Sequence, residues 1–142
     1  MMVAFAIVMS LAIYSGQSHS DELSLGLWTY HFDRDVKDDE CTNEVHNLVG
    51  YRLDNGLTFG GYDNSHCRES YFVGFSQDLY KRNNFAVGWS AGAVTGYPSS
   101  MHVVDGLIII PNAHMTYTIG GVGIKIIYIP NLLKGAGLIY EF

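Results

Sequence analysis

The residues with catalytic potential concentrate in two short stretches of the chain. One stretch, WTYHFDRDVKDDECTNEVH, contains His31, several carboxylates and His46, and the other, GYDNSHCRES, contains Asp63, Asn64 and Ser65. A histidine can act as the general base for a serine hydroxyl, and a neighbouring aspartate or asparagine can orient the imidazole. The two stretches therefore hold the parts of a nucleophile and base pair. Solvated surface loops have the same composition without any catalytic role, so that interpretation stays open beside the catalytic one.

The other titratable residues have simpler interpretations. The acidic run at residues 33–40 is typical of a solvated loop, with divalent-cation contact near a lipopolysaccharide surface as its functional alternative. His102 and His114 are expected to be structural, and the parity of its strand places His114 in the interior. A zinc site needs more ligands at closer spacing than the chain offers, so we predict no metal and no cofactor.

The composition predicts a single β-rich domain. The chain has 142 residues, of which 16 are glycine and 10 are tyrosine, and only 15% are charged. Soluble surfaces carry about a quarter charged residues, whereas glycine with abundant aromatics is typical of all-β architectures. The formal charge of −6 and the lack of any basic run exclude a nucleic-acid partner, because phosphate contacts need clustered Lys and Arg.

Residues 1–20 have the pattern of a secretory signal peptide. Residues 1–14 are apolar and uncharged, and this run is shorter than the roughly 20 residues of a spanning helix. Ser18 and Ser20 suit a small-x-small cleavage site. We therefore expect a mature domain comprising residues 21–142, with a retained membrane anchor as the alternative.

After residue 21, apolar residues alternate with small or polar residues at a period of two, which is the pattern of β-strands. Gly120 and Gly121, and the run from Asp54 to Gly56, suit tight hairpin turns. The pattern predicts eight strands, at residues 23–33, 45–53, 57–62, 70–77, 85–93, 112–119, 122–130 and 135–142.

The two faces of the later strands indicate a membrane barrel. One face carries large aliphatic and aromatic residues, and the other carries Gly, Ser, Thr, Asn and His, a poor solvated exterior but a good barrel interior. A closed barrel also pairs every backbone polar group, as lipid requires. Leu138, Tyr140 and Phe142 alternate to the last residue, as in bacterial outer-membrane barrels. We predict an all-β fold, an eight-stranded antiparallel transmembrane β-barrel in the bacterial outer membrane, with a secreted soluble barrel as the alternative.

This topology bears on the two cysteines. If both termini are periplasmic, Cys41 falls in the first outer loop and Cys67 in the second, on the same side of the membrane. An even cysteine count in an exported protein favours a disulfide between them, with two unpaired thiols as the alternative.

Five stretches, in order along the mature chain, carry a family resemblance: WTYHF, NEVHNLVGYRL, DNSHCRESYFVGF, LIIIP and IIYIPN. Over roughly residues 23–142 the chain resembles the lipid A palmitoyltransferase (PagP-like) family of eight-stranded outer-membrane barrels. The first stretch is similar to the family's first strand, where a tryptophan precedes the catalytic histidine. The third is similar to its Asp-Ser pair, and the last two to its proline-marked gaps.

The resemblance implies an activity and its residues. The family transfers an acyl chain, typically palmitate, from a phospholipid to lipid A while the chain lies inside the barrel. His31 matches the family's base and Ser65 its essential hydroxyl. The family's aspartate directly before the serine is Asn64 here, with Asp63 one step further back. One step along a strand reverses the facing direction, so Asp63 is expected to point away from Ser65 and Asn64 to orient the imidazole.

The resemblance also implies an acyl pocket with lateral access. Ser76 takes the place of the glycine that floors the family's pocket, so we expect an acyl chain shorter than palmitate. Gly74 and Gly88 belong to the small-residue strands that would line this pocket. Pro111 before strand six and Pro130 at the end of strand seven mark the gaps through which lipid enters, because proline offers no N–H to a neighbouring strand.

Strict alternation places His31 on the same face as Leu23, Leu25 and Leu27, away from the interior. We therefore expect a bulge or a strand end to turn His31 inward.

Three functions stay open. The first is an outer-membrane acyltransferase acting on phospholipid and lipopolysaccharide lipid as a monomer, the second a non-catalytic barrel with a structural or surface-recognition role, and the third a lipid acyl hydrolase. The two prolines favour an enzyme, since an inert barrel has no need of lateral lipid access.

Overall fold

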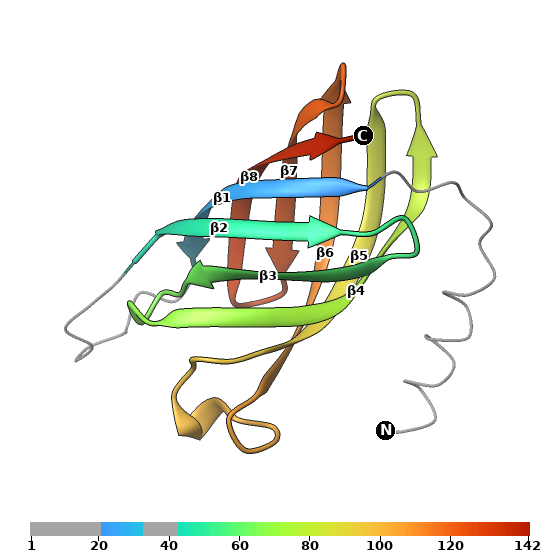
Figure 1. The fold of residues 1–142 in the computed structure, drawn as a ribbon. Coiled ribbons are helices and arrows are strands. Elements are labelled where there is room, and N and C mark those ends of the chain that lie inside the picture. The colour runs from blue at the N-terminus through green and yellow to red at the C-terminus, as the bar shows by residue number, and fades with distance from the viewer. Residues whose placement is uncertain (1–20, 33–42) are drawn as a thin grey trace.

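The chain folds into one closed barrel of eight antiparallel strands (Figure 1). The computed structural model describes residues 21–32 and 43–142. Each strand pairs with the next along the chain, and the last strand, β8, pairs with the first, β1, to close the sheet. Closure removes both sheet edges, so the backbone groups of the barrel wall find partners within it. The predicted all-β eight-stranded antiparallel barrel is confirmed. The predicted signal peptide at 1–20 lies outside the described residues.

The described residues form eight strands and one 3-10 turn: β1 Glu22–His31, β2 Val45–Arg52, β3 Leu57–Asp63, β4 Glu69–Arg82, β5 Phe85–Val94, η1 Ser99–Met101, β6 Ile108–Ile119, β7 Val122–Ile129 and β8 Leu133–Glu141. The two predicted hairpin turns are present. Gly56 donates its N–H to the carbonyl of Leu53, 2.9 Å away, and Gly120 and Gly121 both have positive φ, as a tight hairpin turn requires. In the described part of the chain, no helix is long and apolar enough to cross a membrane.

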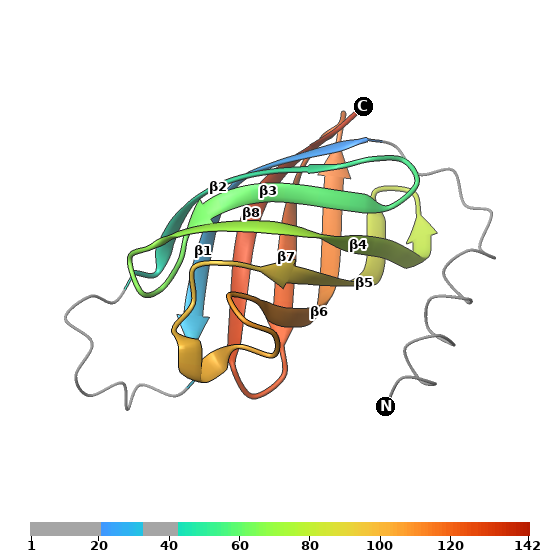
Figure 2. The ribbon, with the colours of Figure 1, turned by 60° about the horizontal axis from the view of Figure 1, so that its bottom comes forward.

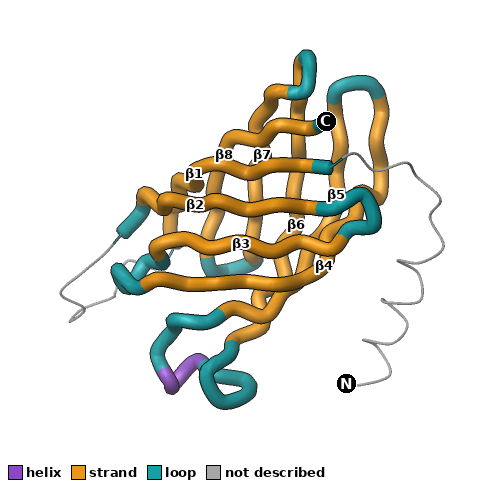
Figure 3. The backbone as a smooth tube through the Cα atoms, in the orientation of Figure 1, coloured by secondary structure: helices purple, strands orange, loops and turns teal. Residues whose placement is uncertain are grey.

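The barrel has two unlike ends (Figures 2 and 3). We call one end the mouth: β1, β3, β5 and β7 finish there, and it carries the longer connections, including the β5–β6 loop with η1. We call the other end the base: it carries the short β2–β3, β4–β5 and β6–β7 turns, together with Asp21 and the C-terminal Phe142, whose N–H donates to the Asp21 carbonyl at 3.0 Å.

The side chains are distributed in the reverse of a soluble protein. Among the described residues, the buried hydrophobic residues are only Ala86, Val94, Ile108 and Ile139. Far more polar residues are buried, namely Glu22, Thr29, His46, Arg52, Asn64, Ser70, Ser76, Gln77, Asp78, His114 and Thr116. The predicted small and polar face therefore lines the interior, and the predicted apolar face covers the outside.

The apolar exterior is ordered along the barrel axis. Exposed aromatic residues near the mouth are Trp28, Tyr30, Phe32, Tyr71 and Tyr128, and those near the base are Phe59, Tyr80, Phe85, Tyr117, Tyr140 and Phe142. Exposed aliphatic residues lie between these two rings, among them Leu25, Val49, Val73, Ile124 and Ile126. An aliphatic band between two aromatic girdles is typical of barrels that cross a bilayer.

A bulge at Gly26 turns His31 toward the interior, as expected from its parity. The register of β1 against both β2 and β8 shifts after Leu25. Gly26 has a φ of 68°, in the left-handed region that glycine adopts without a Cβ clash. Leu25 and Trp28, on either side of the bulge, are both exposed outward. Thr29 and His31 consequently line the interior cavity.

Strand β4 is longer than the sequence predicts. The expected strand ends at Gln77, but β4 continues to Arg82 past a register shift between Asp78 and Tyr80. Asp78 is charged yet only 1% exposed, and Leu79 after it faces outward. The buried charge and the bulge together break the period of two, and so the end of this strand resembles a loop in the sequence.

Pro111 lies inside β6, so the prediction that it precedes strand six is wrong. β6 begins at Ile108, and Pro111 pairs with Ala91 of β5. The β6–β7 ladder starts only at Ala113, opposite Tyr128. The first five residues of β6 therefore pair on one side, and proline is tolerated there because no β7 strand needs its missing N–H.

Candidate active site

A cavity of about 1040 Å³ runs along the barrel interior. The polar residues at its mouth come from β1, β2 and the β1–β2, β3–β4 and β5–β6 loops: His31, Glu44, His46, Ser65, His66 and Tyr97. The shaft below them is apolar and is lined by Leu48, Phe72, Val94, Ile108, Ile127 and Ile139. The volume is at the upper end of the range for small-molecule pockets, about 300–1,000 Å³, and its shape suits a ligand with a polar head and a hydrocarbon tail.

His31 and Ser65 both line this cavity at its mouth. His31 is the last residue of β1, and Ser65 lies in the β3–β4 loop, so the closed sheet joins two segments that are distant in the sequence. His31 lies within electrostatic range of Glu44, His46 and His66. In the described structure no hydrogen bond engages the imidazole of His31, which leaves both of its ring nitrogens available to a substrate.

The side chain of His46 is fixed by hydrogen bonds on both ring nitrogens. Nδ1 contacts the backbone carbonyl of Asp63, which can only accept, so Nδ1 carries the proton. Nε2 consequently accepts from the hydroxyl of Thr29 at 2.8 Å. His46 is 3% exposed and has no nitrogen left for proton transfer. It forms a rigid wall beside His31.

Glu44 is the carboxylate that the structure places at the site. Its side chain lines the cavity, and its backbone carbonyl accepts the N–H of Thr29 at 2.9 Å, fixing it beside β1. Both Glu44 and His46 belong to the first of the two stretches with catalytic potential, but neither was assigned a role at the site from the sequence. Their place at the mouth depends on the register between β1 and β2.

Asn64 organises the β3–β4 loop. Its side chain is fully buried, and its Nδ2 donates to the Ser70 hydroxyl and to the Gly96 carbonyl, both at 3.0 Å. Its Oδ1 accepts the backbone N–H groups of His66 and Arg68 at 2.9 and 3.1 Å. These four bonds use the whole hydrogen-bonding capacity of the amide, so the geometry leaves none for orienting His31 as predicted.

Asp63 faces away from the site. Its Oδ2 accepts from Nδ2 of Asn47 at 3.0 Å on the exposed surface, as its parity predicts. Its contribution to the mouth is the backbone carbonyl that holds His46.

Replacing Asn64 with alanine is expected to lower the free energy of unfolding by about 2–4 kcal/mol, since the part-buried backbone N–H groups of His66 and Arg68 and the buried hydroxyl of Ser70 each lose a partner. Chemical unfolding of the barrel in detergent or lipid measures this loss. Asn47→Ala, which removes one exposed bond, is the matched control and should cost under about 1 kcal/mol. A catalytic Asn64 would instead lower activity without lowering stability.

A pair of tyrosines borders the mouth on the β5–β6 side. The phenol oxygens of Tyr62 and Tyr97 are 2.9 Å apart, and the ring of Tyr97 contacts His66 edge to face at 5.9 Å between centroids. Burial raises the pKa of Tyr97 above its ordinary value, so it stays protonated at neutral pH. The β5–β6 loop also holds His102, which accepts from the Gly106 N–H at 3.1 Å and lies 2.8 Å from the Tyr97 carbonyl, the structural role predicted for it.

Of the three predicted acyl-pocket residues, only Ser76 lines the cavity. A Cβ added to Gly74 would lie 2.3 Å from the Ala91 carbonyl, and one added to Gly88 would lie 2.0 Å from the Gln77 carbonyl. These two glycines therefore allow β4 and β5 to pack closely. Gly74 and Gly88 affect the pocket only through this close packing of the two strands that form its wall.

The β6–β7 wall is open near the mouth. Residues 108–112 of β6 all line the cavity, although alternate residues of a strand point to opposite faces. The stretch has no β7 partner, and the lining of the cavity continues over both of its faces there. Pro111 lies in this opening. Pro130 follows the end of β7, as predicted, and starts a turn in which Leu132 donates to the Ile129 carbonyl at 3.1 Å.

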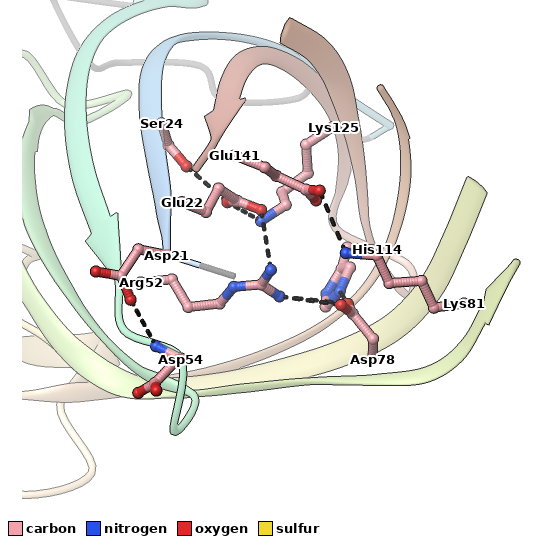
Figure 4. A network of polar contacts seen from close by, with 10 residues as sticks. All are labelled: Asp21, Glu22, Ser24, Arg52, Asp54, Asp78, Lys81, His114, Lys125 and Glu141. Carbon is pink, nitrogen blue, oxygen red and sulfur yellow. Dashed lines mark hydrogen bonds and ion pairs between the residues drawn. The ribbon is translucent and has the colours of Figure 1, made fainter. Parts of the chain in front are cut away.

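A network of ionic contacts lies at the base of the cavity (Figure 4). Arg52 lies between two carboxylates: its Nη1 is 3.3 Å from Oδ1 of Asp78, and its Nη2 is 3.5 Å from Oε2 of Glu22. Lys125 contacts Glu22 as well. Nε2 of His114 is 3.1 Å from Asp78, which confirms the interior, hydrogen-bonded position predicted for His114.

Neither a metal site nor a free thiol is present in the described part of the chain. No group of three or more His, Cys, Asp or Glu residues there could hold a metal ion, and no cysteine described is free. The predicted partner of Cys67 is Cys41, which lies outside the described residues, so their pairing stays a prediction. Comparison with protein-family models and with curated proteins finds no match to this chain.

Proposed function

We propose that this protein is an outer-membrane enzyme that transfers an acyl chain from a phospholipid to lipid A. The observation that carries the proposal is the cavity, in which His31, Ser65 and Glu44 line the mouth and apolar residues line the shaft that leads inward from it. The apolar exterior with its two aromatic girdles supports insertion in a bilayer. The mouth then faces the cell surface, where lipid A lies, and the closed sheet suits a monomer.

The separate positions of His31 and Ser65 support separate roles. No hydrogen bond joins them in the described structure, whereas a serine activated as a nucleophile lies within hydrogen-bond reach of its base. His31 therefore acts on the acceptor, and the Ser65 hydroxyl donates to the carbonyl oxygen of the ester as negative charge develops there. Glu44 stabilises the imidazolium.

The proposed reaction is a direct transfer. A hydroxyl of lipid A gives its proton to His31, and its oxygen bonds to the acyl carbonyl carbon. The bond from that carbon to the glycerol oxygen of the phospholipid breaks, and His31 returns the proton to that oxygen. The products are acylated lipid A and a lysophospholipid. The donor chain enters through the opening between β6 and β7 beside Pro111, so the headgroup need not pass through the barrel.

The mass of lipid A tests this proposal. Lipid A from Gram-negative cells that express the chain, and lack such an activity of their own, should gain the mass of one acyl chain. A decrease in the mass of lipid A would instead indicate an acyl hydrolase that uses the same residues. An unchanged mass, with the barrel folded in the outer membrane, would favour the non-catalytic barrel.

The added chain should be shorter than palmitate, because Ser76 occupies the pocket floor and is 4% exposed. Ser76→Gly removes the CH₂OH group, so we expect that variant to transfer a longer chain than the wild type. Ser99→Gly, in the exposed part of the β5–β6 loop, is the control. The same lipid A spectra give the result, and addition of palmitate alone by the wild-type protein would refute the role of Ser76.

A further inference from the structure

The cavity ends in polar groups rather than in the apolar floor that a methyl-terminated chain would need. Below the apolar shaft it is lined by Glu22, Ser24, Arg52, Ser76 and Lys125, and Ser90 and Asn112 lie higher, on β5 and on the mouth-side part of β6. Most of these groups have a partner: the Ser90 hydroxyl donates to Oδ1 of Asn112 at 2.8 Å, and the Ser24 hydroxyl donates to Oε1 of Glu22 at 3.0 Å.

Two buried side chains at this base have unused hydrogen-bonding atoms. Arg52 is 3% exposed and Glu22 is 1% exposed. Among the described residues, Nε and Nη2 of Arg52 and Oε2 of Glu22 have no hydrogen-bond partner. Nη2 and Oε2 lie 3.5 Å apart, an ion-pair separation that leaves both atoms without a well-formed hydrogen bond. Buried polar groups in native proteins are nearly always paired, and here the unpaired ones line a ligand cavity.

The missing partner must both accept and donate. The Arg52 nitrogens need an acceptor, and Oε2 of Glu22 needs a donor. A hydroxyl group supplies both, accepting from Arg52 while donating to Glu22. A carbonyl would satisfy only Arg52, and an ammonium would satisfy only Glu22.

The charges of the network favour a neutral partner. The carboxylates of Glu22 and Asp78 are matched by Arg52 and Lys125, all four of them in contact within the network (Figure 4). A carboxylate or phosphate on the ligand would add an unmatched charge next to these buried groups, which is costly. A hydroxyl adds none.

We propose that the base of the cavity binds a hydroxyl group on the far end of the hydrocarbon chain that fills the shaft. The ligand class is therefore an acyl chain that is hydroxylated at or near its end. This inference rests on the proposed function only in taking a lipid acyl chain as the occupant. Water offers the same hydrogen-bonding chemistry, so the test must separate a hydroxyl on the chain from a water molecule.

Competitive binding of matched lipids tests the proposal without requiring turnover. The full chain, folded in detergent micelles, is titrated with equal mixtures of two lysophosphatidylcholines of the same length, one with an ω-hydroxyl and one without. Native mass spectrometry then reads the ratio bound, for acyl chains from eight to sixteen carbons, about the range a barrel of this size can enclose. At the length that reaches Arg52, the hydroxylated lipid should be enriched about tenfold, since it pairs groups that the plain chain leaves unpaired.

Arg52→Lys keeps the charge beside Asp78 but removes the forked donors, so it should abolish the enrichment while leaving the plain lipid bound. Arg82→Lys, at the exposed end of β4 and outside the cavity lining, is the matched control and should keep it. If Arg52→Lys does not fold, the wild type provides the second measurement: moving the hydroxyl to the middle of the chain, beside the apolar shaft, should remove the preference.

A bound ratio near one at every length, or one that favours the plain chain, would overturn the proposal and leave water as the partner of Arg52. The outcome is independent of the proposed enzyme activity. A hydroxyl preference with unchanged lipid A would refute the transferase alone, and acyl transfer without a hydroxyl preference would refute this inference alone.

Discussion

We expect the proposed acyl transfer to lipid A to fall at least about a hundredfold in His31→Ala, because general-base catalysis contributes about 10²–10⁴ to a rate. No hydrogen bond of the described structure engages the ring of His31 at the mouth, whereas His46 has both nitrogens engaged. Ser65→Ala should lose about 10²–10³, the usual cost of one donor to a developing oxyanion. Rates are measured with phospholipid donor and purified lipid A in detergent.

One control variant and one further site variant accompany these two substitutions. Ser99→Ala changes a serine of the same end of the barrel that does not line the cavity, and it should keep the full rate. Glu44→Gln removes the charge beside His31 while keeping the shape of the side chain, and it should lower the rate less than His31→Ala does. Near wild-type rates for His31→Ala and Ser65→Ala, from barrels shown to be folded, would contradict the assignment of this site.

The second large effect is on stability. Asp78→Ala should lower the free energy of unfolding by about 3–5 kcal/mol, because removing one partner of a buried ion pair leaves the other charge uncompensated. Asp78 is 1% exposed and is contacted by both Arg52 at 3.3 Å and His114 at 3.1 Å. Its loss leaves Arg52 with Glu22 alone, at 3.5 Å.

Denaturant unfolding of the barrel in lipid vesicles measures this effect. Asp54→Ala is the matched control, because Asp54 lies in the exposed β2–β3 turn and its bond to Asp21 comes from its backbone N–H. Its cost should be within about 0.5 kcal/mol. A loss of less than about 1 kcal/mol for Asp78→Ala would mean that water solvates Arg52 in the variant and that the network contributes little to stability.

The strands and turns of the barrel could be predicted from the sequence because the signals for them are local. The period of two, the hairpin glycines at 120 and 121 and the contrast between the two strand faces each depend on neighbouring residues. A bulge or a strand end in the first strand was expected as well. The alternation that starts at Leu23 places His31 on the outer face, whereas its role in the resemblance requires it to face inward. The predicted strand boundaries were wrong at two places. In β4 the buried charge of Asp78 breaks the alternation, and in β6 the stretch around Pro111 pairs with only one neighbouring strand.

The site was only partly accessible, because its contacts join residues that the register brings together. Ser65 and His31 were predicted from residue type and from the family resemblance, and both line the cavity. Glu44 and His46 reach the mouth only through the pairing of β1 with β2. The sequence also favoured Asn64 as a partner of the imidazole, whereas its four hydrogen bonds run to the loop around it.

The sequence by itself therefore determined that this chain forms eight strands with one apolar and one polar face, since side-chain alternation is a property of each strand alone. Only the tertiary structure decided which polar residues meet inside. Arg52 and Asp78 are 26 residues apart in the chain, and Asp78 and His114 are 36 apart. Their contact depends on closure of the sheet and on the register of every ladder between them, and a one-residue slip in any ladder would turn a strand's inner side chains outward.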